Sequence, residues 1–241
     1  MENESTEEAP APREPGRPPR PLLEATLFFC AFWLRAFIPM APLPAGSGLA
    51  SPDWHLGILV SLLPTTALLL YYIARTEGPA AFGIRARPRA RDLAWALVLT
   101  ALALLLGFLP ELLRGLVPAG SASPFDNPLL AAVGKPDTPP LLLVPLVLLS
   151  CLATGYAEEL FFRVYLLTRL GQAGVGRVAA IIGSSLLFGL AHGSQGPAGA
   201  AIAGLMGALF ALRWRLAKSW HEIALGHGLY DFVVLVALFY A

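Results

Sequence analysis

The segment from Leu141 to Arg163 reads LLLVPLVLLSCLATGYAEELFFR, a largely apolar run that ends in two adjacent carboxylates and an arginine. A run of this length and polarity is typical of a helix that spans a lipid bilayer. Ionisable side chains are costly at that depth, so their presence in an apolar helix indicates a functional site. The segment therefore predicts both a membrane fold and the position of its chemistry.

The composition of the whole chain agrees with a membrane protein. Of its 241 residues, 56% are hydrophobic and 14% are charged, whereas soluble domains average about 25% charged residues. The net charge of +1 gives no basic surplus that would favour a nucleic-acid partner. The two cysteines, Cys30 and Cys151, both lie in apolar runs, which excludes a disulfide framework and a cysteine-rich metal site.

Seven apolar segments predict an all-α fold, a polytopic membrane bundle of about seven transmembrane helices. The first 21 residues are rich in Pro, Glu and Arg, which predicts a disordered tail at 1–21 and a transmembrane domain at 22–241. The first three segments and the last have the length that a spanning helix needs, whereas the fifth and sixth are short unless flanking residues extend them. The segments are 22–41, 54–74, 93–109, 141–156, 178–192, 198–212 and 223–240.

Positive charge alternates between the loops. Arginines and lysines gather after the second, fourth and sixth segments, and the intervening loops hold few of them. Because basic loops stay on the cytoplasmic side, this alternation predicts a cytoplasmic N-terminus and an outer C-terminus. The frequent use of Ala, Pro, Arg and Leu is typical of a GC-rich bacterial genome, so we expect a protein of the bacterial inner (plasma) membrane.

The two adjacent glutamates have different expected roles. Glu159 and Arg163 are one helical turn apart, so we expect the arginine to hold the Glu159 carboxylate in place. Glu158 points about 100° away around the helix, and the residue one turn later on its own face is Phe162. Its surroundings should be more apolar, which suits a general base. The pair thus offers one anchored carboxylate and one that is free to react.

Two histidines lie in later apolar segments. His192 ends the fifth segment, and His227 lies one turn before Asp231 on one helix face. We expect these groups to meet the carboxylates, because ionisable groups inside a membrane usually face a shared cavity. Three chemistries fit such a cluster: activation of water for amide hydrolysis, a divalent metal such as zinc held by Glu158, His192 and His227, and ion coupling in a transporter.

The three motifs, in this order, resemble the CPBP family of intramembrane proteases, which is named for CAAX-protease and bacteriocin-processing members and is also called Abi or Rce1-like. The family pattern is E-E-x-x-x-R, then F-x-x-x-H, then H-x-x-x-N or a similar residue. The resemblance covers a motif core at roughly 141–241. The matching residues are Glu158, Glu159, Arg163, Phe188, His192, His227 and Asp231.

The resemblance implies a glutamate-type intramembrane endopeptidase that needs no cofactor. Glu158 would be the general base that activates water, and Glu159 with Arg163 would orient it. His192 would share the water, and His227 with the last residue of the third motif would stabilise the oxyanion. The implied partners are membrane lipids and a substrate that is a membrane protein or a peptide with a lipidated or C-terminal anchor signal.

Asp231 departs from the family pattern, in which asparagine is commonest at that position. An asparagine amide can donate a hydrogen bond to an oxyanion, whereas an ionised aspartate can only accept one. Either Asp231 is protonated, or it accepts the N–H of His227 and so orients the ring. We expect the second arrangement, because it needs no proton on a buried carboxylate.

The loop charges raise a problem of depth. They place Glu158 at the inner edge of the fourth segment and His192 near the outer end of the fifth, about 20 Å apart at 1.5 Å per residue. We therefore predict that the fourth helix continues through Phe161 to Leu170, which moves Glu158 deeper into the membrane. Two alternatives to an enzyme stay open: a non-proteolytic membrane scaffold of the same fold, and an ion-coupled transporter, although no inverted repeat is visible.

Overall fold

The computed structural model describes residues 20–37, 48–118, 123, 125–129 and 133–240. Within these ranges every regular element is a helix, which confirms the predicted all-α fold. The disordered tail predicted at 1–21 lies outside the described residues, except for Arg20 and Pro21, where the first helix begins.

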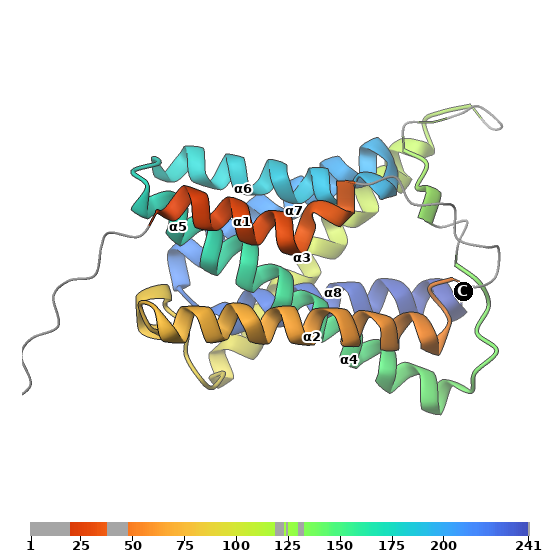
Figure 1. The fold of residues 1–241 in the computed structure, drawn as a ribbon. Helices are drawn as coiled ribbons and strands as arrows, with labels where there is room; N and C mark the ends of the chain where they lie inside the picture. The colour runs from red at the N-terminus through yellow and green to blue at the C-terminus, as the bar shows by residue number, and fades with distance from the viewer. Residues whose placement is uncertain (1–19, 38–47, 119–122, 124, 130–132, 241) are drawn as a thin grey trace, which may run out of the picture.

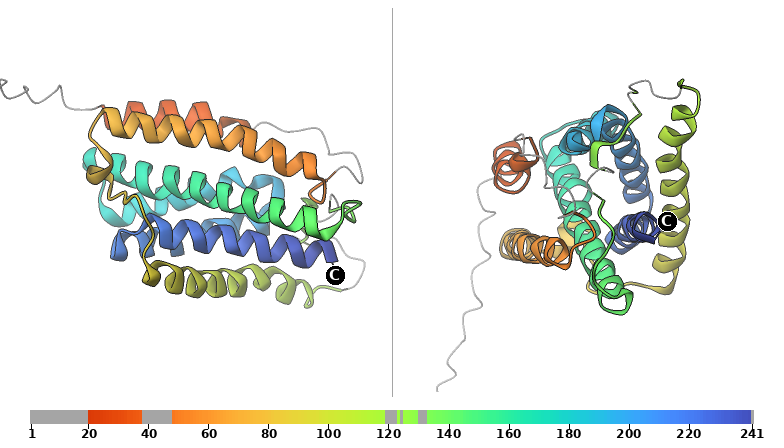
Figure 2. Two further views of the ribbon diagram at one scale, coloured as in Figure 1. Left: turned by 90° about the horizontal axis from the view of Figure 1, so that it is seen from below. Right: turned by 90° about the vertical axis from the view of Figure 1, so that its right-hand side faces the viewer.

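The helices form one bundle in which most members run along a common direction (Figures 1 and 2). In the described part of the chain, five helical stretches are long and apolar enough to cross a membrane, and α1 and α6 are shorter apolar helices. The helices are α1 (Pro21–Trp33), α2 (Pro52–Arg75), α3 (Ala90–Arg114), α4 (Pro140–Glu159), α5 (Leu166–Gln172), α6 (Arg177–Ala191), α7 (Gly196–Ala217) and α8 (Trp220–Tyr240).

Two of the seven predicted spans, the first and the fifth, correspond to the shorter apolar helices α1 and α6. Of the first predicted segment the structure describes the part up to Phe37, as α1 with 13 residues and a 3-10 turn at Leu34–Phe37, and residues 38–41 lie outside the described part. The fifth stays short as α6, with 15 residues, whereas the sixth gains flanking residues and reaches 25 over Gly193–Ala217. Because α6 is short, the α6–α7 turn that follows it lies less far along the bundle than the ends of the longer helices.

The fourth segment belongs to the longest helical stretch, Pro140–Gln172, with 33 residues. α4 passes through a π-helical turn at Leu160–Tyr165 directly into α5, which confirms that the helix continues past Phe161. Nothing in the local sequence predicts the π-helical turn, a wide turn that often marks functional sites. The hydroxyl of Ser184 donates to the carbonyl oxygen of Phe162 inside this turn at 2.8 Å.

The centre of the bundle is the contact between α4 and α8, with α2 and α3 packed on either side and α6 paired with α7. Gly155 allows α4 to approach α8 closely. A Cβ atom at Gly155 would lie 2.4 Å from the carbonyl oxygen of Ala224 and 2.7 Å from the amide nitrogen of Gly228. Small residues are typical of such close helix contacts in lipid.

Replacing Gly155 by valine is expected to destabilise the α4–α8 contact, because the new side chain meets backbone atoms that cannot rotate away. Overpacking of this kind costs about 1–3 kcal/mol, which should appear as a lower midpoint of thermal unfolding in detergent. Gly57→Val in α2 is the matched control, since nothing lies within 4 Å of a Cβ at that position. Equal midpoints for the two variants would show that the contact is not tight.

The loops after α2, α5 and α7 lie at one end of the bundle, on the left in Figure 1, whereas the α3–α4 loop lies at the other end and the α6–α7 turn lies on that side of the bundle. The basic loops of the sequence are those at the left end. The alternation of charge along the chain therefore corresponds to two ends of one bundle. That the basic end faces the cytoplasm stays a prediction.

Candidate active site

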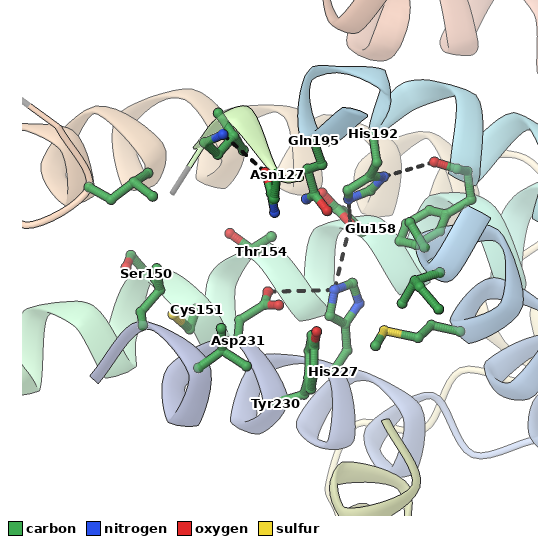
Figure 3. Close-up of a pocket in the computed structure, with 18 of the residues that line it drawn as sticks. Asn127, Ser150, Cys151, Thr154, Glu158, His192, Gln195, His227, Tyr230 and Asp231 are labelled. Carbon is green, nitrogen blue, oxygen red and sulfur yellow. Dashed lines mark hydrogen bonds and ion pairs between the residues drawn. The ribbon is translucent and has the colours of Figure 1, made fainter. Parts of the chain in front are cut away.

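The residues predicted from the sequence come together around one cavity of about 320 Å³ between α4, α7 and α8 (Figure 3). Four of the six line the cavity, and the other two are fully buried beside it. The lining residues are Glu158, His192, His227 and Asp231, and the buried pair is Glu159 and Arg163.

Glu158 presents one carboxylate oxygen to both histidines. Its Oε2 lies 3.9 Å from Nε2 of His192 and 3.8 Å from Nε2 of His227. Both distances are too long for a direct hydrogen bond, and this buried oxygen has no hydrogen-bond partner among the described residues. Buried polar atoms normally have a partner, and here three polar atoms from three parts of the chain face one point of the cavity.

The depth problem is resolved by helix lengths. Glu158 lies near the middle of the 33-residue stretch Pro140–Gln172. His192 directly follows the short α6, so it reaches the level of Glu158 although it belongs to the α6–α7 turn. The prediction that these two residues meet is confirmed.

The ring of His192 is fixed by the end of its own helix. Its Nδ1 lies 2.8 Å from the carbonyl oxygen of Phe188. Because a carbonyl oxygen only accepts, Nδ1 must carry a proton. The neutral ring therefore presents an unprotonated Nε2 to the cavity, where it can accept a hydrogen bond from water.

The ring of His227 is fixed by Glu159. Its Nδ1 donates to Oε1 of Glu159 at 2.8 Å, and Nη1 of Arg163 lies 3.2 Å from the same oxygen. The prediction that Arg163 holds Glu159 is confirmed, and the structure adds that Glu159 in turn holds His227. The Nε2 atom of His227 is thereby directed into the cavity.

Asp231 does not make the hydrogen bond expected of it. Its Oδ2 lies 3.5 Å from Nε2 of His227, on the opposite side of the ring from Glu159. We expected Asp231 to orient His227 by accepting an N–H of the ring, and the carboxylate within hydrogen-bond distance is instead Glu159. Asp231 instead places a second carboxylate on the cavity wall, in addition to Glu158.

Arg163 is buried among aromatic rings rather than solvated. Its guanidinium carbon lies 4.1 Å from the centre of the Phe188 ring, an attractive cation–π contact. Gly207 on α7 leaves room for it, since a Cβ atom there would lie 3.0 Å from Nη2. These contacts fix the position of Arg163, and Arg163 in turn fixes the carboxylate of Glu159.

One part of the chain is similar to a known protein family. Residues 140–233 match the model of a protein family described as "Type II CAAX prenyl endopeptidase Rce1-like". This part of the chain is similar to the Rce1-like family. The matched range includes all three motifs, so the resemblance inferred from them is confirmed. No curated protein and no solved structure matches the chain.

The Rce1-like family is a family of proteases. The chain is an integral membrane protein. The five helical stretches of spanning length in the described residues and the match to this family both support this conclusion. The Rce1-like segment begins with α4 and reaches into α8, so it contains the whole cluster of carboxylates and histidines.

The cavity also has polar side chains outside the three motifs. They are Asn127, Ser150, Thr154, Gln195 and Tyr230. Asn127 and Gln195 come from segments between the long helices, where hydropathy gives no signal. Thr154 lies one turn before Glu158 on α4, so helical spacing is the one signal in the sequence that identifies it.

The two remaining histidines are structural. His55 on α2 contacts Ser150 at 2.7 Å and the carbonyl oxygen of Leu49 at 2.9 Å. His221 on α8 contacts the hydroxyl of Tyr156 at 2.9 Å and the carbonyl oxygen of Arg85 at 3.0 Å. Both nitrogens of each ring are engaged, so neither ring is free to take part in catalysis.

Among the described residues, no three His, Cys, Asp or Glu side chains are arranged closely enough to hold a metal ion. The alternative of a divalent metal held by Glu158, His192 and His227 stays a prediction. The arrangement of these residues supports acid–base chemistry on its own, because an unpartnered carboxylate oxygen faces two imidazole nitrogens.

Proposed function

We propose that the protein is an endopeptidase that hydrolyses a peptide bond in or near the membrane with water activated by Glu158. The observation that carries this proposal is the convergence of Glu158 Oε2 with the Nε2 atoms of His192 and His227. The Rce1-like match supports peptide hydrolysis over the other chemistries that such a cluster permits.

The reaction begins with a water molecule between Glu158 and His192. Glu158 takes one proton from the water while the water oxygen attacks the carbonyl carbon of the scissile bond. The electron pair of the carbonyl double bond moves to the carbonyl oxygen and gives a tetrahedral oxyanion. Glu158 then gives the proton to the leaving nitrogen, and the carbon–nitrogen bond breaks to form a carboxylic acid and an amine.

We assign to His227 the role of oxyanion stabiliser. Its Nδ1 is held by Glu159, so a protonated ring donates from Nε2 into the cavity. The carboxylates of Glu159 and Asp231 supply opposite charges at 2.8 and 3.5 Å from its ring nitrogens. Donors that are fixed before the reaction act most strongly, because they need not reorganise as the charge develops.

We propose as substrate a membrane protein or a peptide with a lipidated or C-terminal anchor signal. The cavity supports this choice, because most of its wall is apolar and side chains such as Val234, Leu235 and Leu238 extend it along α8. We propose further that the enzyme needs no cofactor and works in the bacterial inner membrane with its N-terminus in the cytoplasm. The basic loops at one end of the bundle support this orientation.

The test uses the full-length protein in lipid nanodiscs with two fluorescence-quenched peptides, one with a farnesylated CAAX-type end and one with an apolar C-terminal anchor. We expect cleavage of at least one peptide, with products identified by mass spectrometry and a rate unchanged by a chelator. Loss of cleavage with chelator and its return with zinc would establish the metal alternative. Binding of both peptides without cleavage, by folded protein, would instead favour a scaffold.

A further inference from the structure

The proposed hydrolysis develops negative charge on an oxygen that needs fixed hydrogen-bond donors. His227 supplies one from Nε2. Its neighbour on the cavity wall, Asp231, supplies none when it is ionised, because a carboxylate only accepts. A second donor must therefore come from another part of the cavity.

We propose that Asn127, in the segment between α3 and α4, donates a hydrogen bond from its side-chain NH₂ group to the substrate carbonyl oxygen as that oxygen becomes an oxyanion. The inference rests on the proposed function. Asn127 lines the same cavity as Glu158 and His227. Figure 3 shows it across the cavity from α8, so a peptide bond bound between Asn127 and α8 has the Asn127 amide on one side and His227 on the other.

The orientation of the Asn127 amide is fixed by the backbone. Its Oδ1 accepts a hydrogen bond from the backbone N–H of Leu129 at 3.0 Å. Because a backbone nitrogen can only donate, the side-chain atom facing it must be the oxygen. The NH₂ group then points away from Leu129 and into the cavity, and it donates to no protein group in the described part of the chain.

The segment carrying Asn127 is tied to α3. The guanidinium of Arg114, the last residue of α3, lies 2.8 Å from a carboxylate oxygen of Asp126. The other oxygen of Asp126 accepts the backbone N–H of Ser123 at 3.1 Å. Both carboxylate oxygens of Asp126, the residue immediately before Asn127, therefore have a partner, which fixes the position of this segment.

The same segment is packed against the α6–α7 turn on its other side. Gly196 begins α7 with φ of +79°, and a Cβ atom there would lie 3.0 Å from the carbonyl oxygen of Asp126 and 3.2 Å from Cδ of Pro128. Only glycine fits this backbone conformation and this contact without strain. The turn that carries His192 and the segment that carries Asn127 therefore meet, and both face the cavity.

The test measures cleavage of the peptide that the wild-type protein accepts, with the full-length protein in nanodiscs. Asn127→Asp keeps the size of the side chain and the oxygen that binds Leu129 but loses the donor. We expect kcat to fall about 100-fold, the usual effect of removing one oxyanion donor, with KM and the unfolding midpoint unchanged. Asp231→Asn should partly restore kcat in the double variant with Asn127→Asp, because it returns an amide to the same cavity.

Two results would overturn the inference: a kcat of Asn127→Asp equal to that of the wild type, or a loss that Asp231→Asn does not restore. The second would mean that Asn127 only supports its loop. Glu158→Gln separates this inference from the proposed function. If Glu158→Gln is inactive and Asn127→Asp is fully active, only the role of Asn127 is wrong, whereas an active Glu158→Gln would refute the proposed function itself.

Discussion

Changing Glu158 to glutamine is expected to abolish peptide cleavage and to leave the fold intact. Glutamine has nearly the same shape but cannot take a proton from water at neutral pH. Loss of a general base typically lowers the rate about 10²- to 10⁴-fold. The measurement is kcat for the accepted peptide in nanodiscs, beside the midpoint of thermal unfolding of the same sample.

The fold should tolerate this change because Glu158 holds nothing in place. Its Oε2 has no hydrogen-bond partner among the described residues, and its nearest ionisable contacts are the two imidazoles at 3.8 and 3.9 Å. Glu158→Asp is the matched comparison, since it keeps a carboxylate but withdraws it by one methylene group. We expect its kcat to lie between those of the wild type and Glu158→Gln. A Glu158→Gln protein with wild-type kcat would show that another group is the base.

Changing Arg163 to methionine is expected to have the largest effect on stability. Arg163 and Glu159 are both fully buried, with 3.2 Å between Nη1 and Oε1. Removing one partner of a buried ion pair leaves an uncompensated charge and costs about 3–5 kcal/mol. The free energy of unfolding, measured by denaturant titration in mixed micelles, should fall by this amount. Activity should fall as well, because Glu159 then no longer holds the ring of His227 firmly.

A double variant distinguishes the ion pair from simple packing. When Glu159→Leu is added to Arg163→Met, the buried carboxylate that had lost its arginine partner is removed as well. We therefore expect the double variant to be more stable than Arg163→Met alone. It should still be inactive, because His227 has lost the acceptor of its Nδ1 proton. If the two losses of stability simply add, the residues act independently and the proposed relay from Arg163 through Glu159 to His227 is wrong.

The helices and the main site residues could be predicted because their signals are local. Hydropathy identifies α2, α3, α4 and α8 directly, and charge inside an apolar run identifies Glu158 and Glu159. The one-turn spacing to Arg163 predicts their ion pair, because side chains four residues apart meet on a helix. The continuation of α4 into α5 also follows from sequence, since the site residues can meet only if that helix is long.

Contacts between distant segments could not be predicted in the same way. The hydrogen bond from His227 to Glu159 depends on how α8 packs against α4, whereas the aspartate one turn after His227 led us to expect Asp231 as an acceptor for this ring. The π-helical turn at Leu160–Tyr165 has no marker in its own residues. Asn127 lies in a polar segment without periodicity, and its place at the cavity depends on contacts with Arg114 and Gly196.

Direct attack by water, with Glu158 as base rather than nucleophile, is the central claim. Its most direct test is cleavage of the accepted peptide in heavy-oxygen water with protein in excess, followed by mass spectrometry of the product and of the protein fragment that contains Glu158. We predict one labelled oxygen in the new carboxylate of the product and none in the fragment. Label in Glu158 would show that its carboxylate attacked the substrate and formed an anhydride, and would contradict the proposed mechanism.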